Sequence, residues 1–252
     1  MASSDKVAFI TGGNKGIGLE TARGLGRLGY AVVIGCRDAH KGDAAAEQLR
    51  SEGITPAESV RFDVTRPADH RHVADHLERH YGKLDALVNN AGVALDHADF
   101  GNPGGFNTTE TISPEALRAT FDTNFFGVVG LTQALLPLLR KSPAGRVVNL
   151  SSVLGSLTLH ADPASDIYNV KAFAYDASKT ALNAFTVHLA QAVRGTPIKV
   201  NSAHPGWVKT DMGGAAAPME LSEGGKTSVQ LATLPADGPS GGYFHLGQPL
   251  PW

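Results

Sequence analysis

The chain alternates between short apolar runs and longer helical stretches along almost its whole length, and this alternation limits the folds open to it. The apolar runs predict strands over residues 6–12, 31–36, 59–64, 84–90, 145–152, 198–205 and 241–246. Helices are predicted between most of them, over residues 16–28, 39–51, 67–80, 114–140, 172–194 and 222–234. Strands that alternate with helices pair in parallel and form a doubly wound α/β sheet. Because the runs are apolar almost throughout, helices are expected on both faces.

Residues that begin and end helices agree with this division. Gly29 follows the first predicted helix, and Pro67 and Pro114 can occupy first helical positions. Ser113 and Ser222 can cap the helices that follow them.

Composition narrows the class of protein further. The 252 residues can bury a sizeable core, and without a composition shift, repeat or long linker they predict one domain over residues 1–252. A formal charge of −2, without basic or acidic blocks, argues against nucleic acid as a partner. We expect a cytoplasmic protein, because no apolar run reaches the about 18 residues of a membrane span and no secretion leader is evident. Cys36 is the only cysteine, which excludes an internal disulfide and a cysteine-based metal cluster.

The first predicted strand runs into the sequence TGGNKGIG, residues 11–18, just before the first helix. Glycines at positions 12, 16 and 18 let such a turn approach a pyrophosphate closely, and the helix N-terminus adds amides and a positive dipole. A glycine turn can also serve packing alone. The strand–turn–helix context at the start of a βαβ unit favours dinucleotide binding.

The end of the second strand bears on which dinucleotide is bound. NAD-binding chains usually place an acidic residue there for the ribose 2′-hydroxyl. Here Arg37 follows Cys36, and Lys15 lies in the glycine turn, so two cations could pair with a 2′-phosphate. Asp38 could bind a hydroxyl instead, but it also suits the N-cap of the next helix. We therefore expect NADP(H) rather than NAD.

Two tyrosines are each followed by a lysine, Tyr168 by Lys171 and Tyr175 by Lys179. Spacing separates the pairs poorly, because each lysine lies about one helical turn from its tyrosine. Tyr175 lies near the start of a long amphipathic helix, which is a rigid base for a site. Tyr168 lies in a looser segment, where it could pack or line a pocket.

A phenol with an ammonium nearby can donate a proton, and the reduction of a carbonyl group is one reaction that needs such a donor. Hydride delivery to carbon develops an alkoxide, which needs a proton and a group that holds the oxygen. A free phenol has a pKa of about 10, and a close ammonium favours the phenolate. Ser151 and Ser152 end the fifth strand, where sites in α/β sheets gather, and only one of two adjacent residues should reach the site.

Seven motifs occur in order along the chain: TGGNKGIG (11–18), FDVT (62–65), NNAG (89–92), NFFG (124–127), NLSS (149–152), YDASK (175–179) and HPGWVKTDM (204–212). Together they resemble the short-chain dehydrogenases/reductases, and within that family the NADPH-dependent carbonyl reductases. The resemblance implies a Rossmann-type, mostly parallel sheet of about seven strands in one dinucleotide-binding catalytic domain. It also implies NADPH-dependent, reversible reduction of ketones or aldehydes, with a small carbonyl or alcohol as substrate and no metal.

The resemblance also assigns residues to the cofactor and to catalysis. Asp63 and Val64 would flank the adenine, and Ser152, rather than Ser151, would reach the substrate oxygen. Asn124 would hold a water chain behind the lysine, and it could also bond backbone or kink its helix. The cofactor set is Gly12, Asn14, Lys15, Gly16, Ile17, Gly18, Arg37, Asp63, Val64, Asn90, Ala91, Gly92, Tyr175, Lys179, Pro205, Gly206, Val208 and Thr210. The catalytic set is Ser152, Tyr175, Lys179 and Asn124.

The gap between Ser152 and Tyr175 is longer than usual in the family. Its additional residues, about 154–171, resemble the insertion of monomeric carbonyl reductases but are fewer, so the oligomeric state is left open from monomer to tetramer. Residues 211–221 are rich in glycine and alanine and are a candidate mobile lid. Expected substrate-pocket residues are Val153, Leu154, Trp207 and Met212, with Leu95 behind them.

Three histidines of the third predicted helix could suggest a metal site. His72, His76 and His80 are spaced to share a helix face and could chelate a metal. Val73 and Leu77 are expected to point inward, which favours a solvated face for the histidines.

One alternative function is a 3-oxoacyl-thioester reductase, which usually lacks the long gap before the tyrosine. Another is a non-catalytic NADPH sensor, against which the complete catalytic set argues.

Overall fold

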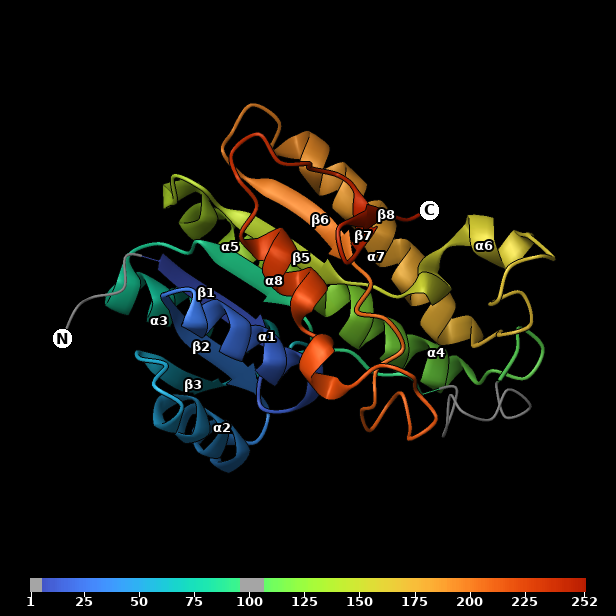
Figure 1. The fold of residues 1–252 in the computed structure, drawn as a ribbon, viewed down its shortest axis with the longest axis horizontal. Coiled ribbons are helices and arrows are strands. Elements are labelled where there is room, and N and C mark those ends of the chain that lie inside the picture. The colour runs from blue at the N-terminus through green and yellow to red at the C-terminus, as the bar shows by residue number, and fades with distance from the viewer. Residues whose placement is uncertain (1–5, 96–106) are drawn as a thin grey trace.

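The structure is built on one sheet of eight strands with helices on both faces (Figure 1). The computed structural model describes residues 6–95 and 107–252. Its strands are β1 (Lys6–Thr11), β2 (Tyr30–Cys36), β3 (Ala57–Arg61), β4 (Ala86–Asn89), β5 (Arg146–Leu150), β6 (Lys199–Ala203), β7 (Tyr243–His245) and β8 (Gln248–Pro249). The sheet order is β3-β2-β1-β4-β5-β6-β7-β8, and every neighbouring pair is parallel except β7 with β8. The direction of winding reverses between β1 and β4, and ligands bind at such a point.

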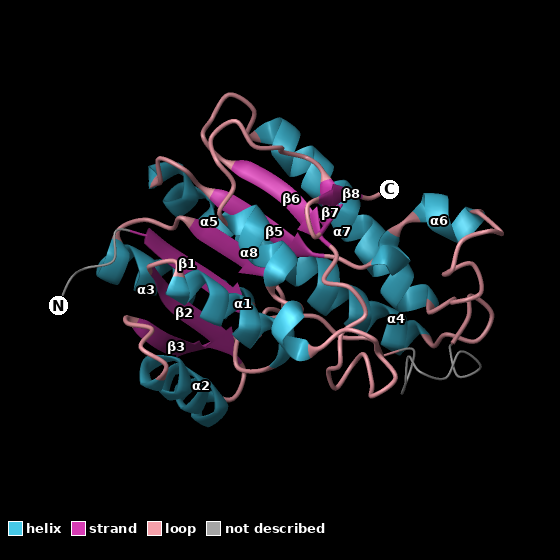
Figure 2. Cartoon of the chain, viewed as in Figure 1, coloured by secondary structure: helices cyan, strands magenta, loops and turns pink. Residues whose placement is uncertain are grey.

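Helices connect the strands and form a layer on each side of the sheet (Figure 2). They are α1 (Gly16–Arg27), α2 (Ala39–Ser51), α3 (Pro67–Tyr81), α4 (Pro114–Phe121), α5 (Gly127–Lys141), α6 (Leu157–Ala161), α7 (Phe173–Ala192) and α8 (Lys226–Ala232). A π-helical turn η2 (Asp122–Phe126) joins α4 to α5. In the described part of the chain, η3 (Val153–Gly155) and η4 (Leu221–Glu223) are 3-10 turns.

Two apolar cores, one on each face of the sheet, hold these layers together. Leu25 of α1 and Leu49 of α2 are fully buried against one face, where α8 also packs. Leu77 of α3 and Leu135 of α5 are fully buried against the other. Successive strand residues supply both cores, which is why the strands are apolar throughout. The prediction of a doubly wound, mostly parallel sheet is confirmed.

Most helix boundaries lie where the sequence predicts them. Asp38 caps α2 by accepting from the Lys41 amide (3.2 Å), and Ser113 caps α4 by accepting from the Ala116 amide (3.1 Å). The cap predicted at Ser222 is wrong, because this residue lies inside η4 and α8 begins only at Lys226.

Three further elements differ from the prediction. The expected single helix over residues 114–140 contains the π-helical turn η2, so it is divided into α4 and α5. Strand β8 and helix α6 were not predicted, because two strand residues and five helical residues are too short to give a periodic pattern. Helix α6 lies within the predicted insertion.

Candidate active site

The turn between β1 and α1 has the backbone of a phosphate-binding loop. Gly12 and Gly16 have positive φ angles of 65° and 58°, which other residues rarely adopt. A Cβ on Gly18 would lie 2.5 Å from the carbonyl oxygen of Gly12, so only glycine lets α1 pack this closely on the turn. Lys15 occupies the N-cap of α1 and its side chain does not cap the helix. The first amides of α1 are therefore available to an anion. Two other predicted turn residues, Asn14 and Ile17, are partly exposed beside them.

Asn90 braces this turn from the end of β4. Its Nδ2 donates to the carbonyl oxygens of Thr11 (2.8 Å) and Gly12 (3.2 Å). The amides of Asn90 and Ala91 both donate to the Thr11 hydroxyl at 2.9 Å. The motifs TGGNKGIG and NNAG are thus joined across two strands. Thr11, which received no role from the sequence, is the residue that joins them.

Positive charge gathers where β2 and β3 end. Arg37 is exposed directly after β2, and Val64 is buried after β3. Burial alone would raise the pKa of Asp63, but bonds from Thr65 and the charges of Arg37 and Arg66 outweigh it and hold that pKa below its usual range. Arg66 is therefore a further cation near Asp63, which the motifs did not predict.

Tyr175 and Lys179 lie one turn apart near the start of α7, and both are buried. The Lys179 ammonium donates to the carbonyl oxygen of Leu150 (2.8 Å) and lies 5.5 Å from the centre of the Tyr175 ring. Burial lowers the pKa of Lys179 to about 8. Gly92 lies over this ammonium, since a Cβ on Gly92 would be 3.5 Å from Nζ. A buried ammonium beside a phenol favours the phenolate, as proton transfer to a carbonyl oxygen requires.

The two serines at the end of β5 have different environments. Ser152 is partly exposed, and its Oγ accepts from the Leu154 amide in η3 (3.2 Å). Ser151 is buried, its amide donates to the carbonyl oxygen of Ala203 (2.8 Å), and its Oγ has no hydrogen-bond partner within the described residues. Of the two, Ser152 has the accessible hydroxyl.

Asn124 lies in the π-helical turn η2 and is completely buried. Its Oδ1 accepts from the Val93 amide (2.9 Å), and its Nδ2 donates to the Val93 carbonyl oxygen (2.8 Å) and to the Ser178 hydroxyl (3.0 Å). The Ser178 hydroxyl donates in turn to the carbonyl oxygen of Tyr175 (2.7 Å). Asn124 therefore bonds backbone and sits in a distorted helix, and it ties the segment after β4 to the helix of Tyr175.

His204, at the end of β6, is a supporting residue that sequence reasoning missed. Its Nδ1 accepts from the Val153 amide (3.1 Å), and its carbonyl oxygen accepts from His245 (2.9 Å). Burial, and then the neighbouring His245, lowers the pKa of His204 to about 3, so the ring acts as a neutral acceptor. Its position directly before Pro205 in the motif HPGWVKTDM was the available signal.

The predicted pocket residues divide into a buried and an exposed group. Leu154 packs with Tyr175 in a small apolar cluster, which Val153, Ile167 and Val170 partly cover. The insertion therefore forms one wall beside the tyrosine. The exposed group is Leu95, Trp207 and Met212.

The predicted lid is bonded to the loop that precedes it. The Met219 amide donates to the Trp207 carbonyl oxygen (3.1 Å), and the Trp207 indole donates to the Gly213 carbonyl oxygen (2.8 Å). Lys15 in the glycine turn pairs with Asp211 at 2.5 Å, so residues 211–221 also contact this turn. Movement of the lid stays a prediction. Of the other predicted cofactor residues in this loop, Pro205 and Val208 are buried, and Gly206 and Thr210 are partly exposed.

Two of the three predicted histidines of α3, His76 and His80, have protein partners. His76 bonds Glu58 (2.9 Å), and its ring lies 4.2 Å from that of His80. Val73 and Leu77 face the core, as predicted. Among residues 6–95 and 107–252 there is no cluster of three or more potential metal ligands. No helix in the described part of the chain is long and apolar enough to cross a membrane.

Comparison with known proteins agrees with this geometry. A family model described as short chain dehydrogenase matches residues 6–221. Human carbonyl reductase [NADPH] 1 is 34% identical, over 96% of this chain and 97% of its own. The (+)-neomenthol dehydrogenase of Capsicum annuum is 30% identical, over 96% of both chains.

Solved structures of reductases superpose on this chain over nearly its full length. Salutaridine reductase from Papaver somniferum superposes with a TM-score of 0.82 and 32% identity, covering 95% of this chain and 99% of its own. An NADPH-bound carbonyl reductase from chicken fatty liver also reaches a TM-score of 0.82, at 29% identity, covering 98% and 99%.

Proposed function

The chain belongs to the short chain dehydrogenase family, and on that premise we propose that it reduces ketones or aldehydes to alcohols with NADPH, with Tyr175 as the proton donor. The reaction is reversible, so the same residues would serve alcohol oxidation. The observation that carries the proposal is the buried Lys179 ammonium, 5.5 Å from the centre of the Tyr175 ring. Relatives named as NADPH carbonyl reductases favour this activity over a 3-oxoacyl-thioester reductase or a non-catalytic sensor.

The residues around the glycine turn fit a dinucleotide. The first amides of α1, free of a side-chain cap from Lys15, would hold the pyrophosphate. Arg37 would pair with a 2′-phosphate, and Lys15 would join it once its ion pair with Asp211 is broken. Arg66, near Asp63, would add positive charge to this end of the site. Asp63 would lie beside the adenine. When bound, NADPH supplies the hydride that reduces the carbonyl carbon.

The catalytic side chains then handle the substrate oxygen. The Tyr175 hydroxyl gives its proton to the developing alkoxide, and the charge of Lys179 stabilises the phenolate that remains. The Ser152 oxygen already accepts from the Leu154 amide, which leaves its own proton free to bond the substrate oxygen. Asn124 holds the segment after β4 against α7, so that the cleft keeps its shape.

The pocket and the composition bear on the substrate class and on the cellular compartment. The apolar wall of Leu154, Ile167 and Val170 suits ketones or aldehydes with hydrophobic groups. The near-neutral charge supports a small-molecule partner rather than nucleic acid, and the single cysteine suits a reducing cytoplasm. The oligomeric state stays open from monomer to tetramer.

A panel of ketones, aldehydes and quinones, assayed with NADPH and with NADH, tests the proposal. We expect substrate-dependent oxidation of NADPH, with a much lower KM for NADPH than for NADH. Arg37→Ala should raise the KM for NADPH about 10- to 100-fold, the loss of one charged contact to a phosphate, and leave that for NADH within about twofold. Absence of turnover with every substrate would contradict the activity. Equal effects of Arg37→Ala on both cofactors would contradict the 2′-phosphate site.

A further inference from the structure

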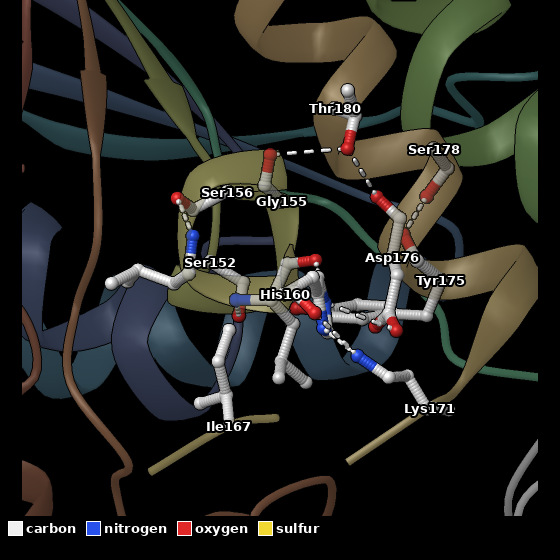
Figure 3. A network of polar contacts seen from close by, with 12 residues as sticks. Ser152, Gly155, Ser156, His160, Ile167, Lys171, Tyr175, Asp176, Ser178 and Thr180 are labelled. Carbon is white, nitrogen blue, oxygen red and sulfur yellow. Dashed lines mark hydrogen bonds and ion pairs between the residues drawn. The ribbon is translucent and has the colours of Figure 1, made fainter. Parts of the chain in front are cut away.

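His160, in the insertion between Ser152 and Tyr175, contacts the neighbours of both catalytic residues (Figure 3). Its Nε2 lies 2.9 Å from the carbonyl oxygen of Leu154 and 3.3 Å from Asp176 Oδ2. Leu154 belongs to the turn that Ser152 caps, and Asp176 follows Tyr175 directly in α7. One imidazole therefore spans the serine turn and the tyrosine helix.

Lys171 fixes the protonation of this imidazole. Its ammonium lies 3.1 Å from His160 Nδ1 and 3.0 Å from the His160 carbonyl oxygen. An ammonium only donates, so Nδ1 accepts and the ring proton is on Nε2. Burial, and then the charge of Lys171, lowers the pKa of His160, against an opposing effect of the Leu154 bond, so the ring is neutral. The Nε2 proton is therefore directed at Leu154 and Asp176.

The second tyrosine–lysine pair of the sequence thus has a structural task. The Lys171 ammonium lies 5.1 Å from the centre of the Tyr168 ring, which favours the cation at this position. Tyr168 is a packing partner of Lys171 here. The pair anchors His160 from the solvent side of the insertion.

The serine turn is fixed at its other end as well. A Cβ on Gly155 would lie 2.9 Å from the Lys179 backbone, so η3 rests directly on α7. The Thr180 hydroxyl donates to the Gly155 carbonyl oxygen (3.0 Å). At Leu154, one residue earlier in the turn, the carbonyl oxygen bonds His160 instead. Without His160, the turn would keep its Gly155 contacts and lose the bond at Leu154, the residue whose amide donates to Ser152 Oγ.

We propose that His160 is a positioning residue that holds Ser152 against the helix of Tyr175, so that both hydroxyls meet on one substrate oxygen. This inference rests on the proposed carbonyl reduction. It assigns the insertion a part in catalysis through the Leu154 carbonyl, the Ser152 turn and Asp176. Because reacting groups must be held closely, a displacement of about 1 Å can cost about 100-fold in rate.

Three variants test the proposal in the full-length enzyme with the best ketone of the panel. His160→Phe keeps a ring and removes both nitrogens, whereas His160→Gln keeps an N–H donor for Leu154. His188→Phe is the matched control, because His188 is an exposed histidine of α7 outside the network. We expect His160→Phe to lower kcat about 10- to 100-fold, His160→Gln to recover part of it, and His188→Phe to match the wild type.

The affinity for NADPH distinguishes a positioning role from a general structural effect. The KM and Kd for NADPH should stay within about twofold in both His160 variants. An unchanged kcat in His160→Phe, or an equal loss of kcat and NADPH affinity, would overturn the proposal. If His160→Phe does not fold, Lys171→Met is the second test. It removes the donor to His160 Nδ1, so the ring proton is no longer held on Nε2, and kcat should fall about threefold. An unchanged kcat in Lys171→Met would then overturn the proposal. A wild type without turnover on the whole panel would instead overturn the proposed function.

Discussion

Lys179 shows the conflict between stability and function at a single residue. The side chain is only 4% exposed, and burial lowers its pKa from 10.5 to about 8. A lowered pKa in a lysine means that folding disfavours the ammonium, here by about 3 kcal/mol at neutral pH. The bond to the Leu150 carbonyl oxygen offsets part of this cost. The charge is retained where the proposed reaction leaves a phenolate on Tyr175.

Lys179→Met should therefore stabilise the protein while abolishing reduction. At pH 7 we expect the free energy of unfolding to rise by about 1–2 kcal/mol, because the methionine removes the buried charge and also loses one hydrogen bond. The free-energy cost of burying the ammonium is present in full below about pH 8. It fades as the pH rises toward 10.5, because the folded protein then holds a neutral amine. The gain should fade over the same range. Urea unfolding at several pH values measures it, with Lys199→Met as control, and a variant less stable than the wild type at pH 7 would contradict this account.

At the scale of elements, the backbone of the β1–α1 turn was predictable, whereas at the π-helical turn η2 the sequence allowed only for a kink at Asn124. The glycines of TGGNKGIG indicate their own backbone geometry, because positive φ angles and close packing leave few alternatives. The stretch before α5 follows a continuous helical pattern in the sequence. The distorted turn holds Asn124, whose bonds to Val93 and Ser178 join segments far apart in the chain. Such tertiary bonds leave no local signal.

Gly18→Ala tests the packing of α1 on the turn. The added Cβ would lie 2.5 Å from both the Gly12 carbonyl oxygen and Asn90 Nδ2, so the turn must open. We expect the Kd for NADPH to rise at least about 10-fold and the stability to fall by about 1–3 kcal/mol. Gly24→Ala in the same helix is the control, because the three atoms nearest to its Cβ all belong to the Val229 side chain and none to the turn. Fluorescence titration with NADPH measures the difference, and equal affinity in both variants would contradict the role of Gly18.

At the scale of the whole molecule, the sheet order explains why distant motifs share one site. Strands β1, β4, β5 and β6 are neighbours and parallel, so the motifs at their carboxyl ends meet at one edge of the sheet. The alternation of strands and helices predicted this arrangement, and the motif residues predicted its chemistry. The supporting residues His160 and His204 were missed, because their roles depend on contacts with η3. Strand β8 was missed because two residues carry no pattern.

The measurement that tests the central claim most directly is the turnover and NADPH affinity of Tyr175→Phe. The phenylalanine keeps the ring that packs beside Leu154 and removes only the hydroxyl. The account predicts that ketone-dependent NADPH oxidation is lost, by about 1,000-fold or more, while the Kd for NADPH stays within about threefold. Turnover within about tenfold of the wild type, with NADPH bound normally, would contradict the assignment of Tyr175 as proton donor.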